Sequence, residues 1–201
     1  MSGGRAAEWP EYYQKTAGRS ARLLLLHALE RCGAASGAVR RAVDVGCGDG
    51  TETCLLLERG WHVTAVDGEP EAITRLRDRP AAHAHADRLH TQVATFDTLI
   101  CPPAELVYAG LSLFFCPPSA FEALWLRLTA ALVPGGVVAA HLLGDRDSWA
   151  ARADMTSHTA AAVRTLLRGC AVEYLAEVEH DGTAVSGPKH WHLWEVVARV
   201  K

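Results

Sequence analysis

The chain lacks the long apolar run that a membrane-spanning helix or a signal peptide needs. Its first apolar run, residues 23–26, is followed directly by His27, and residues 1–9 include Gly, Arg and Glu. A membrane span takes about 20 predominantly apolar residues, and a signal peptide has an apolar core of roughly 7–15. We therefore expect neither kind of segment.

An excess of positive charge is also missing. Twenty Lys and Arg residues stand against 23 Asp and Glu residues, for a net charge of −3, and lysine occurs only at positions 15, 189 and 201. Proteins that bind nucleic acid gather phosphates through a positive field. We expect neither a nucleic-acid nor a membrane partner.

The six cysteines show no Cys-x-x-Cys spacing, which is typical of reduced thiols and indicates a cytoplasmic protein. Two histidine pairs, His83 with His85 and His190 with His192, have the alternate spacing of metal ligands on a strand. Neither pair has matching cysteines, so no metal site is predicted.

What the chain does contain is an alternation of strand and helix patterns. One domain is expected from 201 residues of which 49% are hydrophobic and 21% charged. A helical period covers residues 12–31, and residues 80–88 are expected to form a loop. The strands and helices that follow predict a parallel sheet, with strands at 42–45, 62–66, 89–94, 104–109 and 137–143 and helices at 53–59, 71–77, 121–132 and 160–167. Strands at 172–179 and 193–200, joined by a loop, predict a C-terminal antiparallel hairpin.

A glycine-rich turn joins the first strand to the first of these helices. It reads Asp44-Val45-Gly46-Cys47-Gly48-Asp49-Gly50-Thr51. Its glycine spacing differs from the dinucleotide fingerprint, and it lacks the lysine of a phosphate loop. Two aspartates would repel phosphate, so a ligand with positive charge or hydroxyl groups is expected.

Carboxylates also follow the next two strands. Asp67, about 20 residues beyond the turn, is placed to accept from both hydroxyls of a ribose. Phe96 and Asp97 offer an apolar edge and an acceptor for a purine.

With these residues the sequence resembles the class I S-adenosylmethionine-dependent methyltransferases across nearly its whole length. The resemblance implies a Rossmann-like α/β fold: a seven-stranded, mostly parallel sheet with an antiparallel C-terminal hairpin. It implies S-adenosylmethionine as methyl donor and S-adenosylhomocysteine as product. It places Asp44, Gly46, Cys47 and Gly48 around the methionine moiety, Asp67 and Gly68 at the ribose, and Phe96 and Asp97 at the adenine, with Ala109 as a further cofactor-binding candidate.

The segments 115–118, 144–149 and 188–192 resemble small bacterial methyltransferases of the tellurite-resistance-like group. The run Asn/Asp-Pro-Pro-Tyr of enzymes that methylate amino groups is absent after the fourth strand, which disfavours a nucleobase acceptor. A small-molecule acceptor is expected. The activity for which this group is named, methylation of metalloid oxyanions, is only weakly implied for this chain.

Four residues are candidates for catalysis. Arg146 offers a planar fork for an anion, and His190 or His192 would accept a proton from the nucleophile. Tyr13 would face the sulfonium through a cation–π contact. The expected organisation is a single domain with an N-terminal helical lid at 1–37 and a Rossmann-like core at 38–201.

Two other function classes share the glycine-rich turn. One is an enzyme that uses the sulfonium donor for a non-methylating reaction such as ring closure, and the other is a donor-binding regulatory protein. The acceptor stays open, and the expected oligomeric state is a monomer or a homodimer.

Overall fold

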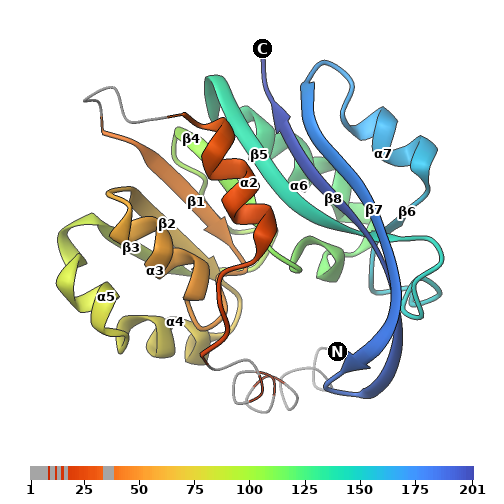
Figure 1. Ribbon diagram of the computed structural model, residues 1–201, viewed down its shortest axis with the longest axis horizontal. Helices are drawn as coiled ribbons and strands as arrows, with labels where there is room; N and C mark the ends of the chain where they lie inside the picture. Colours follow the sequence, from red (N-terminus) through yellow and green to blue (C-terminus); the bar gives the residue numbers. More distant parts are fainter. Residues whose placement is uncertain (1–8, 10–11, 13–14, 16–17, 34–38) are drawn as a thin grey trace.

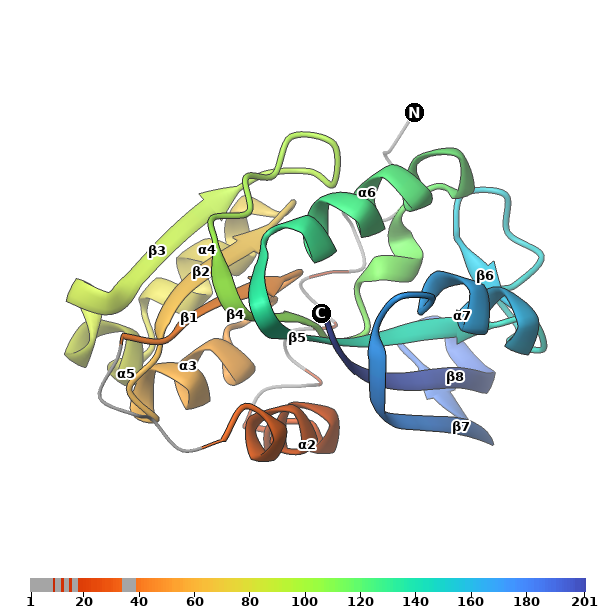
Figure 2. The ribbon, with the colours of Figure 1, turned by 90° about the horizontal axis from the view of Figure 1, so that it is seen from above.

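A computed structural model describes residues 9, 12, 15, 18–33 and 39–201. These residues form a central sheet covered by helices on both faces (Figures 1 and 2). Along the sheet the strand order is β3-β2-β1-β4-β5-β8-β7, and a short strand, β6, pairs with β5 outside this path. The strands are β1 (Arg41–Val45), β2 (His62–Asp67), β3 (Leu89–Val93), β4 (Ala104–Ala109), β5 (Leu132–Gly144), β6 (Ser157–His158), β7 (Ala171–Ala184) and β8 (Gly187–Arg199).

Strands β1 to β5 are parallel, and β8 runs antiparallel to both β5 and β7. The expected sheet and its C-terminal hairpin are therefore confirmed. The sheet has eight strands instead of seven because the two-residue β6 pairs with the C-terminal end of β5, at Leu143 and Gly144.

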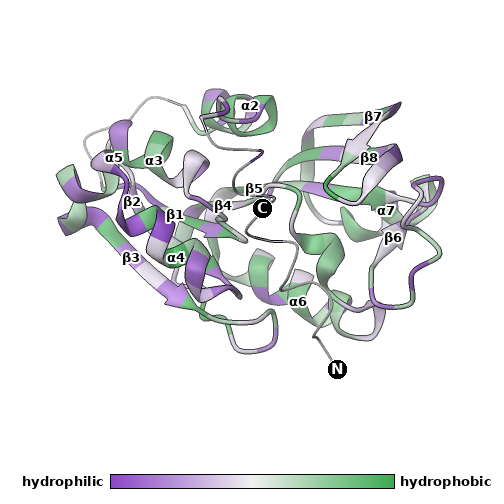
Figure 3. Ribbon diagram, turned by 90° about the horizontal axis from the view of Figure 1, so that it is seen from below, coloured by the Kyte–Doolittle hydropathy of each residue, from purple (hydrophilic) through white to green (hydrophobic). Residues whose placement is uncertain are grey.

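The two faces of the sheet carry separate helical layers. The helices α2 (Leu23–Arg31), α3 (Thr51–Glu58), α4 (Pro70–Arg77) and α5 (Pro80–Ala84) share one apolar core with the sheet. The helices α6 (Pro118–Ala130) and α7 (Ala160–Leu166) share the other. Hydrophobic residues occupy long stretches of α2 and α6 (Figure 3). Within the described residues, no helix is both long and apolar enough to cross a membrane.

Proline sets the start of three helices. Pro70, Pro80 and Pro118 each stand in the first turn, where a fixed φ favours the helix and the missing N–H has no partner to lose. The expected loop at 80–88 is wrong for this reason: it contains α5 and the 3₁₀ turn η1 (Ala86–Arg88).

The N-terminal helical expectation is only partly correct. Residues 9, 12 and 15 are helical, but the segment 18–22 is not, and α2 begins at Leu23. Gly18 has a φ of +75°, which interrupts a helix because this angle lies in the left-handed region.

The C-terminal hairpin is longer than the sequence pattern indicates. The pairing of β7 with β8 continues from Ala171↔Arg199 to Ala184↔Gly187, so the turn is formed by Val185 and Ser186. Lys189, His190 and His192 lie in β8, where a loop was expected.

Candidate functional site

A cavity of about 360 Å³ opens at the carboxyl ends of the parallel strands. Its walls come from the glycine-rich turn after β1, the end of β2 and the segments after β3 and β4. This is the edge at which open α/β sheets bind ligands.

The glycine-rich turn packs too closely against its neighbour for any side chain at its centre. Gly46 has a φ of +74°, and a Cβ there would lie 2.3 Å from the Cβ of Ser112. The Ser112 hydroxyl donates to the carbonyl oxygen of Val45 at 2.5 Å. This contact joins the turn after β1 to the segment after β4.

Asp67 organises the same turn from the end of β2. Its carboxylate accepts hydrogen bonds from the backbone N–H groups of Gly48 and Glu69, each at 2.9 Å. Burial raises the pKa of Asp67. The side chain therefore holds the turn in place and lines the cavity at the same time.

Asp44 lies deeper in the site, at the end of β1. It is 1% exposed and accepts a hydrogen bond of 2.6 Å from the hydroxyl of Thr53. Burial raises its pKa to about 7, because desolvation disfavours the charged carboxylate.

A buried carboxylate brings two arginines to the cavity. Glu52, 3% exposed, accepts from Arg19 at 2.5 and 2.6 Å and from Arg22 at 3.1 Å. The arginines hold the pKa of Glu52 below its usual value even though burial alone would raise it. All three residues line the cavity, and no local sequence pattern indicated them because Arg19 and Glu52 are 33 residues apart.

Two buried polar atoms in the lining have no hydrogen-bond partner among the residues that the structure describes. They are Nε of Arg19 and the hydroxyl of Tyr108. Buried polar groups are nearly always hydrogen-bonded, so an unsatisfied pair beside a cavity indicates a polar ligand there.

Most of the expected cofactor-binding residues line this cavity: Asp44, Gly46, Cys47, Gly48, Asp67, Gly68 and Phe96. Asp97 and Ala109 lie outside its lining. Asp97 accepts a hydrogen bond of 2.7 Å from the hydroxyl of Thr95, and Ala109 is fully buried within the sheet.

A second cavity, of about 600 Å³, adjoins the first. The two share Trp9, Tyr12, Arg22, Leu111 and Phe115. Leu111 has a φ of +56°, the one non-glycine residue of the described chain in the left-handed region. Such backbone strain is concentrated at functional sites, and here it lies where the two cavities meet.

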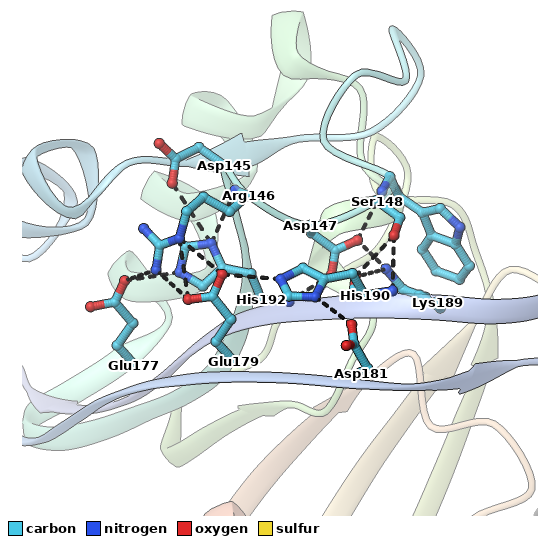
Figure 4. Close-up of polar contacts among 11 residues, drawn as sticks. Asp145, Arg146, Asp147, Ser148, Glu177, Glu179, Asp181, Lys189, His190 and His192 are labelled. Carbon is cyan, nitrogen blue, oxygen red and sulfur yellow. Dashed lines mark hydrogen bonds and ion pairs between the residues drawn. The ribbon is translucent and has the colours of Figure 1, made fainter.

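The structure places the expected catalytic residues Arg146, His190 and His192 in a polar network outside the lining of both cavities (Figure 4). Arg146 pairs with Glu177 and Glu179, each at 2.7 Å. Both carboxylates lie in β7, within the strand expected at 172–179.

Both histidines make hydrogen-bond contacts within the same network. His190 contacts Asp181 and Glu179 at 2.7 and 3.0 Å, and these carboxylates raise its pKa. His192 is fully buried, contacts Glu177 at 3.0 Å, and accepts from the backbone N–H of Arg146 through Nδ1. The fourth candidate, Tyr13, lies outside the described residues.

Among the residues described, no group of three or more His, Cys, Asp or Glu side chains has the arrangement of a metal site.

Comparison with known proteins finds a methyltransferase domain match over the part of the chain that contains this site. Residues 42–136 match the model of a methyltransferase domain. The chain is 34% identical over 149 residues to trans-aconitate 2-methyltransferase of Paracidovorax citrulli (strain AAC00-1), covering 68% of the chain and 55% of that protein. The chain thus spans about half the length of this curated relative.

Solved structures show the same fold. The crystal structure of TehB from Haemophilus influenzae superposes with a TM-score of 0.76 at 14% identity, over 96% of this chain and 67% of that one. A Burkholderia thailandensis 1,6-didemethyltoxoflavin-N1-methyltransferase gives 0.73 at 19% identity, over 98% and 85%. Together with the glycine-rich turn and the acidic strand ends, the domain match and the curated relative support a class I S-adenosylmethionine-dependent methyltransferase.

Proposed function

We propose that this protein transfers the methyl group of S-adenosylmethionine to a small-molecule acceptor. The observation that carries the proposal is the arrangement of Asp44 and Asp67 at the ends of adjacent parallel strands, around one glycine-rich turn and one cavity. The methyltransferase relatives support it.

The residues of the first cavity suit this donor. Asp67 is placed to accept from ribose hydroxyls, and the Phe96 side chain offers an apolar surface for a base. The unsatisfied hydroxyl of Tyr108 and Nε of Arg19 add polar contacts. The terminal nitrogens of Arg19 donate to Glu52, so we assign its Nε to the donor's carboxylate, to which a guanidinium makes charge-assisted hydrogen bonds.

The bound donor supplies a methyl group on a positively charged sulfur, which is a good leaving group. With this donor bound, the acceptor would take the methyl group by direct displacement, and sulfur would keep the electrons of the broken carbon–sulfur bond. The protein's task is then chiefly to align two molecules, which by itself lowers the barrier substantially.

The adjoining cavities fit this task. Trp9, Tyr12, Leu111 and Phe115 face both of them, so they are placed to exclude water between donor and acceptor. We extend the proposal to the domain organisation, with residues 1–37 acting as a lid on a core at 38–201. The contribution of Trp9 and Tyr12 to both cavities supports this division. A cytoplasmic setting is supported by the six free cysteines.

The proposal is tested by calorimetry with S-adenosylmethionine and by an assay for S-adenosylhomocysteine release with a panel of acceptors. Asp67→Ala is expected to weaken donor binding more than tenfold, or about 1.4 kcal/mol or more. It removes the acceptor for ribose, one hydrogen bond to the turn at Gly48 and one to the backbone N–H of Glu69.

Asp78→Ala is the matched control, because it removes an exposed carboxylate that lies outside the cavity lining. Donor affinity is expected to stay unchanged in this variant. Equal affinity in folded Asp67→Ala and wild type would refute the assignment of Asp67, and donor binding without product release on every acceptor would refute methyl transfer.

A further inference from the structure

We propose that the methyl acceptor is a flat aromatic molecule, bound by stacking in the second cavity. This inference rests on the proposed function and assigns the substrate class of the same site. Metalloid oxyanions are thereby excluded as the main acceptor.

A series of aromatic rings in contact with one another forms part of the wall of the second cavity. Trp9 meets Phe115 edge to face with centroids 5.4 Å apart, and Phe115 lies 6.3 Å from Trp149. Trp149 meets Trp191 at 5.7 Å and 60°. These separations fall within the range for favourable ring pairs, roughly 4.5–7 Å, so an aromatic ligand would extend an existing pattern of contacts. Six aromatic residues contribute to the lining: Trp9, Tyr12, Phe114, Phe115, Trp149 and Trp191.

The arginines of this cavity are already paired with carboxylates. Arg22 lies 3.1 Å from Glu52 and also donates to the Tyr12 hydroxyl, and Arg152 lies 3.2 Å from Asp154. Lys15, the third basic residue of the lining, is exposed. An inorganic oxyanion needs several donors that converge on it, whereas here the converging groups are rings.

A buried ion pair of Lys189 and Asp147 lies against the indoles of Trp149 and Trp191. Nζ of Lys189 lies 4.1 Å from the ring centroid of Trp149 and 4.3 Å from that of Trp191. The Lys189 ammonium also donates to Asp147, and both side chains are at most 1% exposed. Because a desolvated ammonium is attracted to the faces of aromatic rings, this pair orients the two indoles (Figure 4 shows the pair in its polar network).

The volume of the second cavity also fits an aromatic acceptor. A volume of about 600 Å³ falls within the range of small-molecule pockets, roughly 300–1,000 Å³. It is much larger than an anion of a few atoms requires. Because the cavity shares Leu111 and Phe115 with the donor cavity, one edge of a bound ring system would face the methyl group.

The test compares 2-naphthol with its saturated counterpart decahydro-2-naphthol, with sodium tellurite as the anion, by calorimetry on protein saturated with S-adenosylhomocysteine. Both alcohols are uncharged at neutral pH and differ chiefly in planarity and aromaticity. We expect 2-naphthol to bind at least tenfold more tightly than decahydro-2-naphthol and tellurite not to bind. Trp149→Leu and Trp191→Leu are each expected to weaken 2-naphthol binding about tenfold.

Trp149→Phe, which keeps a ring, is expected to retain most of the affinity, and Leu126→Ala, an exposed change on α6, to retain all of it. Equal binding of the two alcohols, tellurite binding, no binding of 2-naphthol, or undiminished binding in both leucine variants would each overturn the inference. S-adenosylhomocysteine binding, measured first on the same protein, separates the two proposals. Its absence refutes the proposed function, whereas its presence without 2-naphthol binding refutes only the acceptor class.

Discussion

Asp44 shows at the residue scale how burial prepares one carboxyl group for a cationic ligand. Its pKa is raised to about 7 by desolvation, so its ionised fraction grows from about one-tenth at pH 6 to about nine-tenths at pH 8. The same shift lowers folding stability as pH rises from about 4 to 7, because in that window the folded state binds more protons than the unfolded state.

If the ionised form binds the positively charged donor, affinity for S-adenosylmethionine rises with pH. We expect a gain of about tenfold between pH 6 and pH 8 in the wild type. Asp44→Asn, which keeps the shape and an acceptor for Thr53, is expected to lose most of this gain. Calorimetry at pH 6, 7 and 8 on both proteins measures it, and equal slopes would show that Asp44 does not govern donor binding.

Gly46 allows a second test at a single residue. Gly46→Ala is expected to lower the free energy of unfolding by about 1–3 kcal/mol, because alanine is strained in the left-handed backbone conformation. The collision of the new Cβ with Ser112 adds to this loss. Gly135→Ala is the matched control, since Gly135 has a φ of +78° and nothing within 4 Å of the added Cβ. Urea unfolding should therefore show a smaller loss for Gly135→Ala, and equal losses would mean that the turn relaxes away from Ser112.

At the scale of elements, the loop after β5 is fastened to the C-terminal hairpin through Asp147. Its carboxylate contacts the Lys189 ammonium and accepts from the backbone N–H groups of Trp149 at 2.9 Å and His192 at 3.0 Å. The loop and the hairpin together form one side of the second cavity.

This arrangement predicts that removing the Asp147 charge lowers folding stability more than removing the Lys189 charge. Asp147→Asn is expected to cost about 3–5 kcal/mol, because it leaves a buried ammonium without its counter-ion. Lys189→Met is expected to cost less, since the carboxylate keeps two backbone donors. Urea unfolding of both variants and of the double variant checks the order. A larger loss for Lys189→Met would contradict it, as would no recovery in the double variant relative to Asp147→Asn.

For the whole molecule, donor binding is expected to stabilise the folded state. A ligand at one hundred times its Kd adds about 2.7 kcal/mol. For a domain of this size that corresponds to a rise in Tm of about 5–10 °C. In Asp67→Ala the same donor concentration should raise Tm by about half as much, if affinity falls tenfold. Differential scanning calorimetry measures both shifts, and an unchanged Tm in wild type at saturating donor would contradict the first cavity as the binding site.

The sequence by itself determined the features that depend on neighbouring residues. The turn at 44–51 and the acid at 67 could be identified because a strand, its glycines and the following helix are continuous in the chain. The parallel sheet followed from alternating strands and helices, since each helical crossover returns the chain in the same direction. Seven of the nine expected cofactor-binding residues line the first cavity for this reason.

Only the tertiary structure decided the contacts between distant segments. Glu52 gathers Arg19 and Arg22, and the second cavity joins Trp9 to Trp191. Arg146, His190 and His192 carry typical catalytic groups in the sequence, yet strand pairing assigned them carboxylate partners from β7. Such partners are set by register across a hairpin, and register depends on burial of one face of the sheet, which a linear pattern of residues does not specify.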